Sequence, residues 1–472
     1  MGSAIPRGEP LLPAGVAAGH PATAAAGAEV LEDGGTAADA AVAAGLASCV
    51  AETVMTGLLG GGHIVYWDAS RRSARNLDCF VAVPMNASPS GEDLLRLEVP
   101  FGQELVHYAV GPASCGVPGL PAGLDALWRE HGTLPWPRLV EPAIQLARDG
   151  VEFPPAHAAC LAMLAPVMTM DDGARIYAPT GRLLEAGERL EQPGLVSALE
   201  AIASEGARSV YDGTLADALV ELCAERGGSV THEDLLSYEA RWSDAVEAPC
   251  LGRRLLTRRG LSGMPEHAPR LPRVRDLGET ERVLALVDVL RDDGGRQAHT
   301  TNTTIVDGSG NACVVTTSLG LGSGDFLPGL DLHLNSMLGE LDLVHEPLRP
   351  GARMQSMMAP TIVLDGDGEV ELAAGAAGGT RLRTALLGVI GGILDEGLEP
   401  ADAIARPRFH RAGETINAEP GVDDSALDRL GELGWSVRRW PAPHHYFGGV
   451  SVIGRSGAAG DPRRSGAAAT AP

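Results

Sequence analysis

The sequence predicts a layered α+β fold in which mainly antiparallel sheets lie between layers of helices. Two segments, 303–317 and 361–374, each place β-prone residues on both sides of a glycine-containing turn, which predicts two hairpins. Long segments with helical spacing occur before the first hairpin, at 20–54, and after the second, at 381–395. Hairpins with flanking helices of this length fit a layered architecture.

The first 150 residues are expected to contain four helices and one strand. Residues 1–15 carry several prolines and glycines, which predicts a loose arm. His20–Val54 is alanine-rich, and Gly34-Gly35 divides it into two helices. The glycine cluster Gly57–Gly62 precedes a short β-prone run, which predicts a tight turn into a strand at His63–Trp67. Further helices are expected at Leu120–His131 and Pro142–Gly150.

The rest of the chain changes character at Thr300. Residues 155–250 have mainly helical spacing, and the Arg- and Pro-rich residues 251–298 are expected to form a surface connection with one helix near Thr280–Leu290. From Thr300 onward the two hairpins follow, and then a long apolar helix at Arg381–Asp395. The composition of the last ten residues is typical of disorder.

Composition excludes several classes of function. The chain has 472 residues and a net charge of -24, so phosphate backbones and anionic membrane surfaces repel it. No run of 18 apolar residues occurs, and the start has no apolar run of signal-peptide length. We therefore expect a cytoplasmic protein that binds neither nucleic acid nor membranes. Apolar residues make up 44% of the chain and aromatics 4%, which predicts a core of small, closely packed residues.

No metal or cofactor is expected. The seven cysteines include no CxxC pair, so zinc-type ligand spacing is absent and a disulfide framework is not predicted. All 37 basic residues are arginine, which excludes a lysine Schiff base and a phosphate-loop lysine. His444-His445 has no acidic or cysteine residue nearby in the sequence to complete a metal site.

Twelve blocks of the sequence resemble the γ-glutamyltranspeptidase family, and they occur in the family's order across nearly the whole chain. The resemblance implies the N-terminal-nucleophile hydrolase fold, an αββα sandwich with two central sheets between helical layers. It also implies that the tail at 461–464 packs into the fold, against the indication from composition. The blocks are His20-Pro21, Gly34–Ala44, Gly57–Gly62, Gly116–Gly119, Gly132–Trp136, Pro142–Ile144, His299–Asp307 with Gly310–Ala312, Arg353-Met354, Pro360–Val363, Gly378–Arg381, Pro407–His410 and Asp461–Arg464.

The resemblance further implies a proenzyme that cuts itself between His299 and Thr300. The products would be a large fragment, 1–299, and a small fragment, 300–472, which stay associated. A threonine hydroxyl is a weak nucleophile, but an N-terminal threonine carries its own base, an α-amino group with a pKa of about 7.7–8.0. The family's oxyanion donors match Gly378 and Gly379, and Ser318 stands where the family keeps the hydroxyl that orients the nucleophile.

The departures from the family concentrate at the positions that bind substrate. Phe80 stands where the family has the arginine that binds the α-carboxylate of the glutamyl group, and an apolar ring cannot pair with a carboxylate. Ser356-Met357 replaces a pair of serines. The stretch that usually binds the α-amino group is altered to Asn335-Ser336-Met337-Leu338-Gly339-Glu340, in which Glu340 is a remnant. The catalytic residues are thus kept and the residues that hold γ-glutamyl are mostly lost.

We therefore expect a self-cleaving hydrolase repurposed for a small-molecule substrate other than a γ-glutamyl compound. The reaction would be hydrolysis of a C–C bond next to a carbonyl, or of an amide, in secondary-metabolite biosynthesis. One actinobacterial branch of the family cleaves such a C–C bond in making alkylproline units. An ordinary γ-glutamyl hydrolase or transpeptidase acting on glutathione-like amides is an alternative. It would need another arginine, of which Arg75 is the nearest in sequence. A second alternative is an inactive scaffold, which an uncut chain would indicate.

Overall fold

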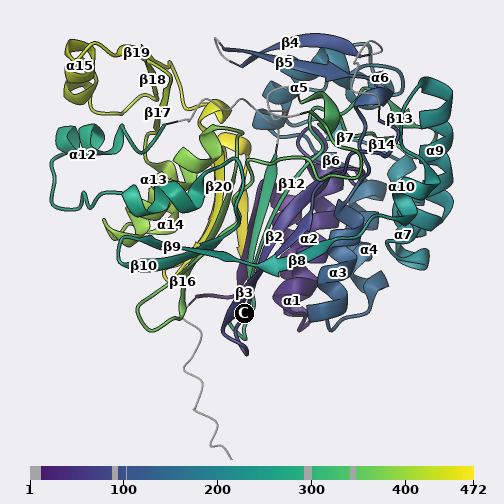
Figure 1. Ribbon diagram of the computed structural model, residues 1–472, viewed down its shortest axis with the longest axis horizontal. Coiled ribbons are helices and arrows are strands. Elements are labelled where there is room, and N and C mark those ends of the chain that lie inside the picture. Colours follow the sequence, from purple (N-terminus) through teal and green to yellow (C-terminus); the bar gives the residue numbers. More distant parts are fainter. Residues whose placement is uncertain (1–11, 88–93, 102–103, 292–299, 341–346, 472) are drawn as a thin grey trace, which may run out of the picture.

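Two antiparallel sheets pack face to face between two layers of helices (Figure 1). The computed structural model describes residues 12–471, except 88–93, 102–103, 292–299 and 341–346. Within both sheets every paired strand runs antiparallel to its neighbour. The predicted αββα sandwich is confirmed.

The first sheet has seven strands in the order β22-β1-β11-β12-β2-β3-β8. Its centre is the hairpin predicted to start at Thr300, and the predicted strand after the glycine cluster pairs with that hairpin. Its strands are β1 (Gly15–Ala18), β2 (Gly61–Asp68), β3 (Ser73–Cys79), β8 (Arg241–Asp244), β11 (Thr301–Val306), β12 (Ala312–Ser318) and β22 (Ala467–Thr470).

The second sheet has six strands in the order β21-β20-β16-β15-β10-β9, and the other predicted hairpin lies inside it. The prediction of a surface connection is wrong for residues 253–257, which form an inner strand of this sheet. Arg253 and Arg254 obscured that strand, but their side chains pair with Glu371 and Glu247 at its surface. The strands are β9 (Val246–Cys250), β10 (Arg253–Thr257), β15 (Thr361–Leu364), β16 (Val370–Ala377), β20 (Gly449–Gly454) and β21 (Gly457–Gly460).

An apolar core fills the space between the two sheets. The first sheet contributes alternate residues of its central strands, such as Val65, Val306 and Val314, and the second sheet contributes Ile362 and Ile453 among others. Alternation along each strand places these side chains on one face. Toward Thr300 the inward-facing residues of the first sheet become polar, as in Asn302 and Thr316.

Alanine-rich helices cover the outer face of the first sheet. Every residue of α2 is buried, and its alanines and glycine let neighbouring helices and strands approach closely. The predicted core of small residues is therefore present in this layer. α4 begins at Trp136, six residues before its predicted start, because Pro137 fits the first turn and Pro142 lies inside the helix. The helices are α1 (Pro21–Glu32), α2 (Ala37–Ala51), α3 (Leu120–His131) and α4 (Trp136–Asp149).

The region 155–250 is helical as far as residue 236 and then forms β8 and β9, so the helical prediction is wrong for its last ten residues. Its helices are α5 (Pro155–Met168), α6 (Gly173–Tyr177), α7 (Gly194–Glu205), α8 (Ser209–Asp212), α9 (Thr214–Arg226) and α10 (His232–Leu236). Helices α13 (Arg381–Leu394) and α14 (Pro400–Ala405) cover the second sheet, and α11 (Met264–His267), α12 (Glu279–Leu286) and α15 (Asp424–Glu432) lie on the same side of the chain (Figure 1).

Small sheets complete the fold. They are the pairs β4 (Leu95–Phe101) with β5 (Glu104–Val110), β6 (Val151–Glu152) with β7 (Arg189–Leu190) and β13 (Phe326–Leu327) with β14 (Leu332–His333), and the three strands β17 (Phe409–Ala412), β18 (Thr415–Ala418) and β19 (Ser436–Arg439).

The tail is ordered. Strand β22 pairs with β1, and the short 3-10 helix Pro462–Arg464 lies buried before it. The disorder indicated by composition is therefore wrong for residues 463–471, because the main chain of 467–470 completes the edge of the first sheet. The packing of residues 461–464 that the resemblance implied is confirmed.

Candidate active site

Thr300 lies directly before β11, at the end of the gap between the two sheets. It is 3% exposed and lines a small cavity. The walls come from the ends of both sheets and from the tail, and they include Glu52, Ala377, Gly449 and Arg464. His299, on the other side of the expected cleavage bond, lies outside the described residues.

The strand register places Ser318 and Phe80 on the same row as Thr300. Thr301 pairs with Thr317, so Ser318 is the next residue along, opposite Thr300, and Ser318 itself pairs with Gly61. Continuing the pairing of Gly62 with Cys79 puts Phe80 beside Gly61. Directly paired residues project from the same face of a sheet, so the row points toward the second sheet. Ser318 is buried, and its hydroxyl accepts a hydrogen bond from the Gly320 amide at 3.0 Å.

The two glycines expected to bind the oxyanion form the turn from β16 to α13. Gly378 has φ 134° and Gly379 has φ 57°, both in the region that favours glycine. A Cβ atom on Gly378 would lie 2.8 Å from the Cα atom of Gly448, so the close approach of the two chains also requires glycine. The turn precedes a 14-residue helix, whose N-terminal end favours negative charge.

Glu52 is a buried acid in this cavity that the sequence analysis did not identify. Its carboxyl group accepts hydrogen bonds from the hydroxyls of Thr23, at 2.7 Å, and of Thr301, the residue after Thr300. Burial raises the pKa of Glu52 to about 7, while these hydrogen bonds and the charge of Arg464 act in the opposite direction. The signal that could have identified it is an acidic residue placed directly after the last turn of an alanine-rich helix.

Phe80 belongs to an apolar cluster. Its ring stacks on the buried His63, with ring centroids 5.6 Å apart, and its carbonyl oxygen accepts a hydrogen bond from the Tyr238 hydroxyl at 2.8 Å. The other members are aliphatic or carry thioethers, so the surroundings of the Phe80 side chain are largely apolar. They are Val81, Val83, Met337, Leu338, Met354 and Met358.

The remaining expected substrate-binding residues are also buried. The Asn335 amide nitrogen donates to the carbonyls of Leu59 and Gly116, and its oxygen accepts from the amides of Gly116 and Met337. These four contacts use its whole hydrogen-bonding capacity, so Asn335 has no free group to offer a ligand. Glu340 lies beside Gly320, because a Cβ atom on that glycine would be 3.0 Å from the Glu340 carboxyl group.

Ser356 and Met357 lie in the segment that leads to β15. The Ser356 hydroxyl accepts a hydrogen bond from the Met358 amide at 3.1 Å, and its carbonyl accepts one from the partly buried Arg258 at 3.3 Å. Both residues are less than a tenth exposed. They are therefore shielded from solvent, and the next residue, Met358, belongs to the apolar cluster around Phe80.

Arg75 does not replace the missing arginine. Its guanidinium pairs with Glu130 and stacks over Trp242, 4.5 Å from the ring centroid, on the helical side of the first sheet. Two other arginines lie closer to Phe80. Arg353 stacks over Tyr238, 4.0 Å from the ring centroid, and the Tyr238 hydroxyl donates to the Phe80 carbonyl. Burial is the main cause that lowers the pKa of His63, the residue on which Phe80 stacks, and the charges of Arg258 and Arg353 both lower it further. The region near Phe80 is thus not free of arginine.

Among the described residues, no group of three or more His, Cys, Asp or Glu side chains could hold a metal ion. The seven cysteines are buried and unbridged. Within the part of the chain that the structure describes, no helix is long and apolar enough to span a membrane.

Comparison with known proteins identifies the family. The sequence profile described as "Gamma-glutamyltranspeptidase" matches residues 23–265 and 280–471. The chain belongs to the γ-glutamyltranspeptidase family. It is accordingly a hydrolase of the γ-glutamyltranspeptidase and acylase type.

Relatives in this family carry two kinds of name. Acylase ACY 1 proenzyme of Pseudomonas sp. (strain V22) is 26% identical, over 93% of this chain and 89% of its own length. Glutathione hydrolase proenzyme of Bacillus subtilis (strain 168) is 24% identical, over 96% of this chain and 90% of its own length. The crystal structure of cephalosporin acylase from Bacillus halodurans superposes with a TM-score of 0.81 at 22% identity, covering 99% of this chain and 98% of that one. The last likeness shows the fold.

Proposed function

We propose that this γ-glutamyltranspeptidase-family hydrolase matures by cleavage between His299 and Thr300 and then uses Thr300 to attack an acyl group other than γ-glutamyl. The fragments 1–299 and 300–472 stay associated, because in each sheet strands of one fragment pair with strands of the other. The proenzyme names of the relatives support maturation of this kind.

The residues around Thr300 suit acyl transfer. The new α-amino group takes the proton of the Thr300 hydroxyl, which attacks the substrate carbonyl. The carbonyl oxygen becomes negative and is stabilised by the main-chain amides of Gly378 and Gly379, where one donor contributes roughly 2.7–4 kcal/mol. Ser318, opposite Thr300 on the neighbouring strand, orients the hydroxyl. Collapse of the intermediate breaks the bond to the leaving group, which takes the proton held by the α-amino group. The acyl group stays on Thr300 until water releases it.

The position of Phe80 is the observation that carries the change of substrate. Phe80 lies on the same row of the first sheet as Thr300, inside an apolar, methionine-rich cluster. A carboxylate placed against this ring would lose its hydration without gaining a partner, which costs several kcal/mol. The site therefore favours an acyl group that has no α-carboxylate at this position.

The bond that breaks is a C–C bond next to a carbonyl or an amide, and we place the reaction in secondary-metabolite biosynthesis. Both bonds use the same attack by Thr300. In the first case the leaving group is a carbanion that the substrate stabilises by conjugation, and in the second it is an amine. The acylase names among the relatives support the amide.

Glutathione hydrolysis is the second candidate function, because Arg258 and Arg353 lie near Phe80 and relatives carry that name. Either arginine could bind the α-carboxylate if the apolar cluster opened. Efficient hydrolysis of γ-glutamyl 4-nitroanilide would favour this candidate over the first.

Intact mass of the purified protein tests the proposal, with Thr300→Ala and Thr300→Ser beside the wild type. We expect wild-type fragments of 299 and 173 residues, an uncut Thr300→Ala chain, and cleavage of Thr300→Ser, which keeps a hydroxyl. The cut protein should hydrolyse simple acyl 4-nitroanilides faster than γ-glutamyl 4-nitroanilide. A wild-type chain that stays whole would contradict the proposal and indicate a scaffold.

A further inference from the structure

Arg464 is a buried cation whose guanidinium pairs directly with no carboxylate among the described residues. It is 6% exposed. Its two terminal nitrogens make only long contacts, to the Met55 sulfur at 3.5 Å and to the His445 carbonyl at 3.4 Å, and its Nε has no hydrogen-bond partner among these residues. Burying an unpaired guanidinium is costly, so its retention at this place calls for an explanation.

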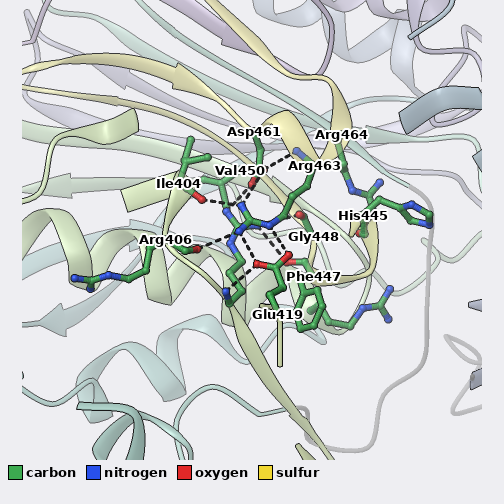
Figure 2. A network of polar contacts seen from close by, with 12 residues as sticks. Ile404, Arg406, Glu419, His445, Phe447, Gly448, Val450, Asp461, Arg463 and Arg464 are labelled. Atoms are coloured by element: carbon green, nitrogen blue, oxygen red, sulfur yellow. Dashed lines mark hydrogen bonds and ion pairs between the residues drawn. The ribbon is translucent and has the colours of Figure 1, made fainter. Parts of the chain in front are cut away.

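The neighbouring Arg463 shows the contrast. Its guanidinium lies in a network with Glu419 and Asp461, whereas Arg464, in the same turn, lies beside His445 (Figure 2). Arg464 lines the same cavity as Thr300. A Cβ atom on Gly378 would lie 3.7 Å from its guanidinium, so this charge is also close to the proposed oxyanion site.

The charged groups around Arg464 are already engaged. Asp461 pairs with Arg408 and Arg463, and both carboxyl oxygens of Glu52 accept threonine hydroxyls. Burial holds the pKa of His157 at about 3, so that ring is neutral. The charges of Glu52 and Asp461 act on Arg464, but within the part of the chain that the structure describes no carboxylate forms an ion pair with its guanidinium.

We propose that Arg464 binds a carboxylate of the substrate inside the Thr300 cavity. The acyl group that the protein transfers then carries a second, acidic function besides the carbonyl that Thr300 attacks. This inference rests on the proposed hydrolase function and adds a substrate class to it. It also explains why an apolar Phe80 is tolerated. The substrate carboxylate is bound by Arg464 of the tail, on one side of Thr300, so no carboxylate-binding residue is needed after β3 on the other side.

Matched pairs of substrates test the proposal on the mature protein. Succinyl, glutaryl and adipyl 4-nitroanilides are compared with their terminal amides, such as 4-carbamoylbutyryl 4-nitroanilide, which have nearly the same shape and no charge. For at least one chain length we expect the wild-type kcat/KM to be about 100-fold higher for the acid than for the amide. This comparison needs no variant, so it holds even if substitutions at Arg464 impair folding.

Variants assign the preference to Arg464. Arg464→Gln should remove most of the acid preference while changing kcat/KM for the neutral amide less than about threefold, and Arg464→Lys should keep part of it. Arg259→Gln removes an exposed arginine that contacts Glu266 and should change neither rate. Equal loss on the acid and on the amide would overturn the proposal, since it would mean that Arg464 acts on the oxyanion or on the fold.

Calorimetry separates this inference from the proposed function. Binding of the free dicarboxylate to the mature wild type, and its loss in Arg464→Gln, would support the carboxylate site even if no anilide is hydrolysed. Hydrolysis of the anilides without acid preference or dicarboxylate binding would leave the hydrolase function standing and overturn the role of Arg464.

Discussion

Arg463 and Glu419 form a buried, bidentate ion pair that joins the tail to the segment after β18. Arg463 Nε lies 2.7 Å from one carboxyl oxygen of Glu419, and Nη2 lies 2.5 Å from the other (Figure 2). The two side chains are 4% and 0% exposed. Arg463 also donates to the Ile404 carbonyl at 2.7 Å, so one side chain fixes the turn from which Arg464 enters the Thr300 cavity.

Arg463→Met should destabilise the fold by about 3–5 kcal/mol, because it leaves Glu419 buried without its partner. Urea unfolding of the uncut Thr300→Ala chain would measure this. Adding Glu419→Met should recover part of the loss, since no charge is then left buried. Arg455→Met, which breaks a half-exposed pair with Asp365, is the control and should cost less than about 1 kcal/mol. A cost that small for Arg463→Met would contradict the importance of the buried pair.

Gly378→Ala should lower kcat at least about 100-fold. The residue has φ 134°, and an added Cβ would lie 2.8 Å from Gly448, so the turn that presents the proposed oxyanion donors must move. The matched control is Gly388→Ala in the adjacent helix α13, where an added Cβ meets nothing within 4 Å. That change should leave kcat unaltered and stabilise the helix by about 0.5–1 kcal/mol. Equal kcat for the two variants would remove Gly378 from the mechanism.

The hairpins and the helices α1 to α3 could be predicted because their signals are local. Period-2 and helical spacing, and the break at Gly34-Gly35, depend only on neighbours in the sequence. Strands β10 and β22 could not be predicted in this way. β10 contains two adjacent arginines and β22 is a run of alanines, and each becomes a strand through pairing with a distant segment.

The residues of the candidate site likewise fall into two groups, those predicted from the sequence and those found only in the structure. The resemblance pointed to Thr300, Ser318 and the two glycines through motifs in the sequence. Glu52 and Arg464 become notable only through burial, because an acid or an arginine is usually solvated and the sequence does not show which ones the fold encloses. Asn335 is the opposite case. The sequence predicted that it binds substrate, but all the hydrogen-bonding groups of its amide are used by main-chain atoms.

Asn335→Ala should therefore affect stability rather than substrate affinity. The change leaves buried carbonyls of Leu59 and Gly116 without their donor, which costs about 1–3 kcal/mol for each unsatisfied group. We expect a lower melting temperature and a KM within about twofold of the wild type. A large rise in KM at unchanged stability would show instead that the amide contacts substrate.

Glu52→Gln should stabilise the protein at alkaline pH and have little effect in acid. The folded-state pKa of about 7 lies above the ordinary value of 4.5, so the folded chain holds more protons between these two values than the unfolded chain does. The associated stability is fully present below about pH 4.5 and is lost as the pH rises through 7. The pKa difference corresponds to roughly 3 kcal/mol, which sets the upper limit of the gain at pH 8. Urea unfolding between pH 4.5 and 8 in the uncut Thr300→Ala background measures it, with the exposed Glu185→Gln as control. A gain that does not change with pH would show that the Glu52 carboxyl group does not ionise in this range.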